Sequence, residues 1–279
     1  MKITTAFAFA CLTTFGATAW ANAAVPAGAA GGGIFADASL AIAVRGSQRS
    51  PENTVRDRFR HPRESLSFWG LKPRMSVLEI WPSQGYWTEI LAPYVKATGG
   101  SYSAAVPNPS RPLPAKFGDK SVYGEIATTV FNKDSGPLVA PGIVDFVLTA
   151  RNIHDWMATP GMPEKAMKDF YAALKPGGIL AVEQHRSDPR PMLKDASDGY
   201  MSTAYVVSLA EKAGFKLEAQ SEINANPRDT KDHPFGVWTL PPTRRSSPSG
   251  QPPNPSFDHS KYDAIGESDR MTLRFRKPA

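Results

Sequence analysis

Short apolar runs alternate with amphipathic segments along most of the chain. The apolar runs have the length and the β-branched or aromatic character of buried strands, and the segments between them repeat apolar residues at helical spacing. Strands are expected at 77–80, 101–106, 122–126, 144–149, 179–183, 215–223 and 271–276. Helices are expected at 35–44, 86–96, 163–174 and 202–213, and one or two more within 49–69. This alternation predicts an α/β domain in which helices connect parallel strands.

The first 23 residues have the pattern of a cleaved export signal. Lys2 precedes an apolar run at 3–15, and an alanine-rich stretch ends at Ala23. The run is shorter than the roughly 20 residues that a spanning helix needs, so no stable membrane insertion is expected. The sequence therefore predicts a periplasmic or secreted protein. Its one cysteine, Cys11, lies inside the signal, so cysteine chemistry is excluded from the mature chain.

The mature chain divides into two parts by composition. Residues 24–48 are expected to form a flexible linker and a short helix, and residues 49–279 the α/β domain. A proline-rich stretch at 240–256 is expected to be a surface insertion, because a strand-like segment follows it. The formal charge of the whole chain is +6, but Lys and Arg are scattered, so nucleic acid is not an expected partner. The pattern does not specify an oligomeric state.

The first predicted strand leads into an unusual turn. It carries an acid, Glu79, and is followed by Trp81-Pro82-Ser83-Gln84-Gly85, a turn with a single glycine, before a helix begins. A strand, a tight turn and a helix in this order are typical of the opening unit of a nucleotide-binding α/β fold.

Several motifs together resemble the class I S-adenosylmethionine (SAM) dependent methyltransferases. After the opening unit come VDFVLT at 144–149, LKPGG at 174–178, ILAVEQHR at 179–186 and AGF at 213–215. Two C-terminal segments, NPRDTKDHPFGVWTLPP at 226–242 and IGESDRMTLRF at 265–275, resemble an exported bacterial branch of predicted methyltransferases. The resemblance covers nearly the whole mature chain. It implies a Rossmann-like, doubly wound, mostly parallel seven-stranded sheet with an antiparallel C-terminal strand, and methyl transfer from SAM to a small or aromatic acceptor.

The resemblance also implies which residues would bind the cofactor. Glu79 and Gly85 match the family's acid and glycine-rich turn, and Trp81 stands where a small residue is usual. Asn108 stands near the end of the second strand, where the family has an acid that accepts hydrogen bonds from both ribose hydroxyls. A chain that departs from the pattern at these two positions can also be a cofactor-free enzyme.

Polar residues follow two neighbouring strands at the edge where such sheets bind ligands. Asn152 and His154 follow one strand, and Glu183 and His185 end the other, so these four are the catalytic candidates. Imidazoles titrate near neutral pH and suit proton transfer, although each histidine could instead cap a loop. A small-molecule substrate is expected to contact Tyr86, Arg151, Trp156, His233 and Trp238. No metal is expected, because the histidines and carboxylates lack a tight ligand spacing.

Three functions stay open at this point. The first is SAM-dependent methyl transfer. The second is a cofactor-independent lyase, isomerase or hydrolase that uses the same histidines on a small molecule such as an aromatic one. The third is a binding protein with a catalytically inactive methyltransferase fold. Glu267, Asp269 and Arg270 are expected to form a buried ion network that holds the last strand.

Overall fold

The computed structural model describes residues 37–279, which form one α/β unit. The predicted signal at 1–23 and most of the predicted linker lie outside the described residues. Seven strands make one sheet in the order β3-β2-β1-β4-β5-β7-β6. Their bounds are β1 Ser76–Ile80, β2 Ser101–Val106, β3 Ile126–Val130, β4 Val144–Ala150, β5 Leu174–His185, β6 Lys216–Ser221 and β7 Arg270–Arg276. Only the pairs that include β7 are antiparallel, so the predicted fold class is confirmed.

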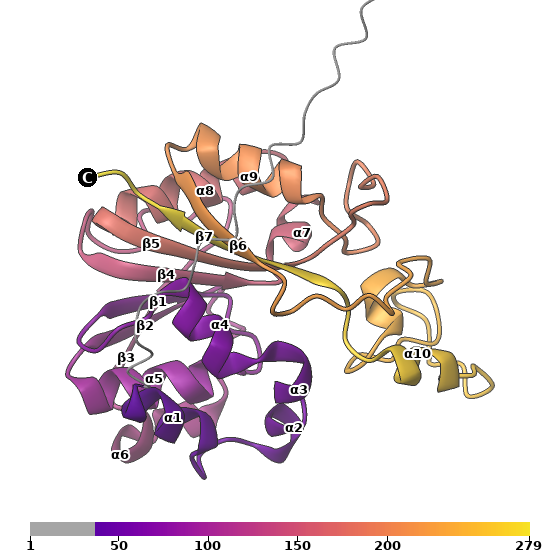
Figure 1. The fold of residues 1–279 in the computed structure, drawn as a ribbon, viewed down its shortest axis with the longest axis horizontal. Coiled ribbons are helices and arrows are strands. Elements are labelled where there is room, and N and C mark those ends of the chain that lie inside the picture. The colour runs from indigo at the N-terminus through magenta and orange to yellow at the C-terminus, as the bar shows by residue number, and fades with distance from the viewer. Residues whose placement is uncertain (1–36) are drawn as a thin grey trace, which may run out of the picture. The chain divides into compact units, whose positions relative to one another are not determined.

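Helices cover both faces of this sheet (Figure 1). One face packs against α7, α8 and α9, and the other against α1, α4 and α5. The main helices are α1 Ala38–Arg45, α4 Pro62–Trp69, α5 Thr88–Thr98, α8 Met162–Ala173 and α9 Thr203–Lys212. Shorter ones are α2 Pro51–Thr54, α3 Asp57–Arg60, α6 Lys120–Tyr123, α7 Ile153–Trp156 and α10 Ser260–Ile265, with 3-10 turns η1 Ala115–Gly118 and η2 Gly236–Thr239.

Alternating side chains of the strands supply the two hydrophobic cores. In β1, Leu78 and Ile80 face the α8 and α9 layer, whereas Val77 faces the α1 and α5 layer. This period of two is the geometry of a strand whose two faces are both covered. Both faces of the sheet are therefore covered by helices.

Three predicted elements differ from the structure. The weak strand at 122–126 is wrong: Asp119 accepts a hydrogen bond from the backbone N–H of Ser121 and starts α6, and β3 begins only at Ile126. The strand expected at 179–183 begins earlier, because Leu174 already pairs with Val144 and β5 starts there. The helices expected within 49–69 number three, not one or two.

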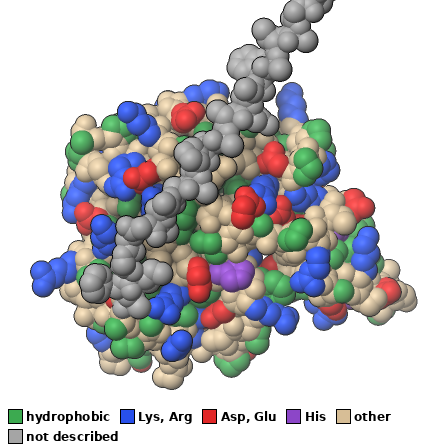
Figure 2. Space-filling view, viewed as in Figure 1, with side chains coloured by type: hydrophobic (Ala, Val, Ile, Leu, Met, Phe, Trp, Pro, Cys, Tyr) green, Lys and Arg blue, Asp and Glu red, His purple; other side chains and the backbone are tan. Residues whose placement is uncertain are grey.

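The proline-rich insertion adopts irregular backbone. Residues 240–259 contain no helix or strand. On the face seen in Figure 2, Lys and Arg side chains are spread over the described surface and do not gather into one patch. Within residues 37–279, no helix combines the length and apolar character that crossing a bilayer requires.

Candidate functional site

A cavity of about 950 Å³ lies at the carboxyl ends of the strands. The ends of β1, β2, β4 and β5 contribute to its wall, together with the segment around η2 and the loop that precedes β7. This is the edge of the sheet where the sequence predicted a ligand site. The predicted site residues that line it are Glu79, Trp81, Tyr86, Arg151, Asn152, His154, His185 and Trp238.

Five predicted site residues do not line this cavity. The ring of Phe117 packs so closely on Gly85 that a Cβ there would lie 2.2 Å from it. Asn108 accepts a hydrogen bond from the backbone N–H of Ser110 at 2.9 Å, which closes a local turn. Trp156 is 1% exposed and packs between Phe131 and Phe170 in the core.

The other two are held by buried polar partners. Glu183 is fully buried and pairs with Arg270 at 2.8 Å. Nε2 of His233 lies 2.8 Å from Oδ1 of Asp229, which also accepts a hydrogen bond from Tyr200 at 2.9 Å. His233 therefore fixes the fold of its loop, while Trp238, further along that loop, reaches the cavity.

The turn after β1 has the backbone of a glycine-rich turn but only one glycine, Gly85. The φ angles are 45° at Trp81, 55° at Ser83 and 82° at Gly85. Left-handed backbone costs roughly 1–2 kcal/mol for a residue that carries a Cβ. The chain thus keeps three left-handed positions here and bears the strain at two of them.

The indole of Trp81 is fixed on the side of β3. Its Nε1 donates a hydrogen bond to the carbonyl of Phe131 at 2.8 Å. The ring also meets Trp156 edge-on, with centroids 5.8 Å apart, and Phe131 at a tilt, with centroids 6.3 Å apart. The side chain thus occupies space above the ends of β1 and β3 instead of leaving it open.

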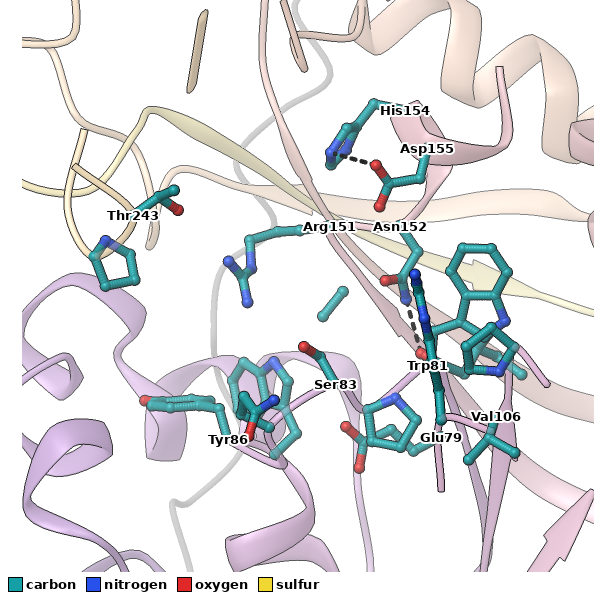
Figure 3. A pocket seen from close by; sticks show the side chains of 18 of the residues that line it. Glu79, Trp81, Ser83, Tyr86, Val106, Arg151, Asn152, His154, Asp155 and Thr243 are labelled. Carbon is teal, nitrogen blue, oxygen red and sulfur yellow. Dashed lines mark hydrogen bonds and ion pairs between the residues drawn. The ribbon is translucent and has the colours of Figure 1, made fainter. Parts of the chain in front are cut away.

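Glu79 is a buried carboxyl group at the base of the cavity (Figure 3). Thr88 donates a hydrogen bond to its Oε2 at 2.9 Å, and the hydroxyl of Tyr102 donates to the same oxygen. Burial raises the pKa of Glu79 to about 7, although these two hydrogen bonds work against the rise. Its charge therefore changes within the neutral pH range.

His154 and His185 lie together on the cavity wall, with ring centroids 5.2 Å apart. Burial lowers the pKa of His154. Burial, and then the neighbouring His154 and Arg151, hold the pKa of His185 well below its ordinary value of 6.5. Both rings are thus neutral at pH 7, which leaves each with one N–H donor and one nitrogen acceptor.

Gln184 fixes the proton of His154. The backbone N–H of Ile153 donates to Oε1 of Gln184 at 3.2 Å, which turns the amide nitrogen toward His154. That nitrogen lies 2.9 Å from Nδ1 of the ring. Nδ1 must therefore accept, and the neutral ring carries its proton on Nε2, 3.4 Å from Oδ1 of Asp155.

Ser268 contacts the second histidine, although its place in the sequence did not identify it as a site residue. Its Oγ lies 2.5 Å from Nδ1 of His185, and both residues line the cavity. Among the described residues no side chain bonds Nε2 of His185. When Nδ1–H donates to Ser268, Nε2 is the acceptor that faces the cavity. The motif GESDR contains Ser268, but its charged residues indicated only the ion network.

Part of the predicted ion network is present and adjoins the cavity: Glu267 and Arg270 belong to it, whereas Asp269 pairs with Arg186 and Lys231 instead. Glu267 is 4% exposed and pairs with Arg56 at 2.6 Å, and with Arg60 and Arg270 at 2.9 Å. Within the described part of the chain, no group of three or more His, Cys, Asp or Glu could hold a metal ion.

The fold is similar to that of solved SAM-dependent methyltransferases. One from Aquifex aeolicus is 20% identical over 63% of this chain and 88% of its own, with a TM-score of 0.51. The [4+2]-cyclase SpnF is 13% identical over 79% of this chain and 80% of its own, with a TM-score of 0.53. No protein-family model matches the sequence, and no curated protein matches it. At these identities the likeness concerns the fold.

Proposed function

We propose that this protein is an enzyme that moves protons on a small molecule in the cavity, as a lyase or isomerase does, without SAM. The observation that carries the proposal is the pair of neutral imidazoles on one wall, 5.2 Å apart between ring centroids. In this scheme His185 accepts a proton at Nε2, and its Nδ1–H donates to Ser268. His154 offers its Nε2–H as a donor to the negative charge that develops on the substrate.

The cofactor that the fold implies does not fit the residues present. SAM carries a ribose whose hydroxyl groups need hydrogen-bond acceptors, and the resemblance implies an acid at the end of β2 for them. The cavity wall there consists of Val106, Pro107, Ser110, Arg111, Pro112 and Leu113, with no carboxylate among these described residues. The anchored indole of Trp81 fills further space above the ends of β1 and β3. A proposed location outside the cytosol, where SAM is made, supports the same conclusion.

A calorimetric titration with SAM and with S-adenosylhomocysteine tests the cofactor-free part. We expect no heat of binding and no thermal shift at about 1 mM of either compound. A micromolar dissociation constant, about −8 kcal/mol, would overturn the proposal.

Proton transfer itself is measured in D₂O. Proton NMR would follow loss of C–H signals next to the carbonyl of charged and neutral small molecules, such as phenylpyruvate and phenylacetone. We expect the wild-type protein to accelerate exchange of at least one of these compounds above the protein-free rate, and His185→Gln to leave that rate unchanged. Ser268→Ala is expected to slow exchange less than His185→Gln does, because Nε2 remains in place. Equal exchange in wild type and His185→Gln would assign the proton transfer to another group.

Methyl transfer is the second candidate, and one observation favours it. The left-handed backbone at Trp81, Ser83 and Gly85 is the conformation that a cofactor-binding glycine turn would need. The variant Trp81→Gly separates the two proposals. If the indole blocks a cofactor site, the variant gains affinity for SAM. Unchanged affinity would mean that the indole packs outside any such site.

A further inference from the structure

We infer that Arg151 binds an oxyanion group of the substrate, either a carboxylate or a phosphate ester. The inference deepens the proposed function, on which it rests for the identity of the cavity as a substrate site. It starts from a guanidinium group that points into the cavity and contacts no acid.

Arg151 follows the last residue of β4 in a strained conformation. Its φ angle is 60°, and its backbone N–H donates to the carbonyl of Glu183 at 2.7 Å, which continues the β4 and β5 pairing. Figure 3 shows its side chain extending into the cavity that Ser83, Tyr86 and Thr243 also line. A left-handed backbone costs a non-glycine residue about 1–2 kcal/mol. Here this conformation places the Arg151 side chain in the cavity.

Among the described residues, Arg151 has no ion pair and no side-chain hydrogen bond. Its Nε is buried without a partner. Arginine carries five N–H donors and cannot serve as an acceptor, so each donor needs water or an anion. Burial, followed by the repulsion of Arg60, lowers its pKa to about 9, so the group stays charged at pH 7.

The two acids close to Arg151 already form ion pairs with other arginines. Glu267 pairs with Arg56, Arg60 and Arg270, and Glu183 pairs with Arg270. Four guanidinium groups thus face two carboxylates, and the two imidazoles nearby are neutral. Such an excess of positive charge in a mostly buried region is favourable only when an anion or water compensates it.

The side chains that line the cavity indicate what kind of molecule carries the anionic group. Aromatic side chains of Tyr86, Trp87 and Trp238 line it alongside Arg151. A planar, bidentate guanidinium suits a carboxylate or a phosphate, and the aromatic wall suits an apolar body. We therefore expect an anion with an aromatic or apolar body to bind, and its neutral counterpart not to bind.

Thermal shift and calorimetry with three probes test this inference. The probes are benzoate, phenyl phosphate and the uncharged benzamide, each in a constant concentration of chloride. We expect benzoate or phenyl phosphate to stabilise the wild-type protein and benzamide to have no effect. Arg151→Gln should weaken the binding of that anion at least tenfold. The better of the two anions identifies carboxylate or phosphate as the group that Arg151 recognises.

Matched variants keep the test decisive. Arg244→Gln removes a half-exposed arginine that pairs with Asp263, and it should bind the anion like the wild type. Arg151→Lys keeps the charge and covers the case in which Arg151→Gln fails to fold. It should still weaken binding, because lysine lacks the planar guanidinium that donates two parallel hydrogen bonds to one anion. The inference is overturned if neither anion stabilises the wild type, or if the Arg151 variants bind as tightly as it does.

Binding and chemistry are separated by His185→Gln. This variant should bind the anion normally, because His185 is not part of the guanidinium site. Normal binding together with unchanged proton exchange in His185→Gln would contradict the proposed proton transfer and leave the anion site intact. Loss of binding in the Arg151 variants alone supports the anion site whatever the reaction proves to be.

Discussion

Replacing Glu79 with Gln is expected to change the pH dependence of stability in one direction. The carboxyl group is 3% exposed, and burial raises its pKa from 4.5 to about 7. A raised pKa means that the folded protein holds the proton more tightly than the unfolded chain does. The resulting stabilisation is complete below about pH 4.5 and is lost as the pH rises through about 7.

The size of the effect follows from the gap between the two pKa values. One pKa unit corresponds to about 1.4 kcal/mol, so the wild type should lose about 3 kcal/mol relative to Glu79→Gln between about pH 4.5 and pH 8. Glutamine keeps an oxygen that can accept from Thr88 and Tyr102, so the substitution mainly removes the titration. Other titrating groups, including the two cavity histidines, are present in both proteins and cancel in the difference.

Urea unfolding of both proteins at several pH values measures this difference. Glu125→Gln is the matched control, because the Glu125 side chain is 79% exposed and pairs with a Lys120 side chain that is itself 69% exposed. That variant should follow the wild-type profile. Parallel profiles for the wild type and Glu79→Gln would refute the reasoning, because they would mean that Glu79 titrates alike in the folded and unfolded chain.

Three further substitutions probe the framework of the site. Glu267→Gln leaves the buried Arg60 and Arg270 and the half-buried Arg56 without their shared acid, so it should cost about 3–5 kcal/mol in urea unfolding. The exposed Glu125→Gln should cost less than about 1 kcal/mol, and a loss below about 1 kcal/mol for Glu267→Gln would disprove the role of the network. Ser83→Gly should raise stability by about 0.5–1 kcal/mol, because the exposed Ser83 has a φ of 55°, and a loss of stability would show that its hydroxyl group compensates the strain. Gly236→Ala should lower the melting temperature more than Gly250→Ala. A Cβ on residue 236 would lie 2.2 Å from the carbonyl oxygen of Asp198, whereas a Cβ on residue 250 would meet nothing within 4 Å. Equal shifts would mean that the backbone at Gly236 moves to relieve this contact.

The sequence was most informative where a local pattern decides the structure. Strands such as β2 and β4 are short apolar runs, and their carboxyl ends necessarily meet at one edge of a parallel sheet. For that reason His154 and His185 could be brought together from sequence alone. The strand expected at 122–126 failed because Val122 and Tyr123 favour strands, whereas the capping side chain of Asp119 starts a helical turn.

The roles of individual side chains depended on partners far along the chain. Glu183 lies near the end of β5, where a catalytic acid would be expected, but it forms a buried ion pair with Arg270 of β7. Ser268 gains its role only because β7 runs antiparallel beside β5 and brings its preceding loop to His185. For His233 the sequence does carry a signal, because Asp229 lies only four residues before it and can pair with it locally.

Backbone strain occurs both in the turn after β1 and at Arg151, and both lie at the cavity. Trp81, Ser83 and Arg151 all line the cavity, and all three have left-handed backbone. Glycine would relieve the backbone strain at each position, although at Trp81 it would also remove the packing of the indole. The two large side chains have visible tasks, since one indole closes space above β1 and one guanidinium enters the cavity unpaired among the described residues. The indole of Trp81 is held by its packing and its hydrogen bond to Phe131, which gives it a structural reason to stay. The guanidinium of Arg151 has no such partner among the described residues, and the anion that we infer in the cavity supplies a reason to keep it at a cost in backbone strain.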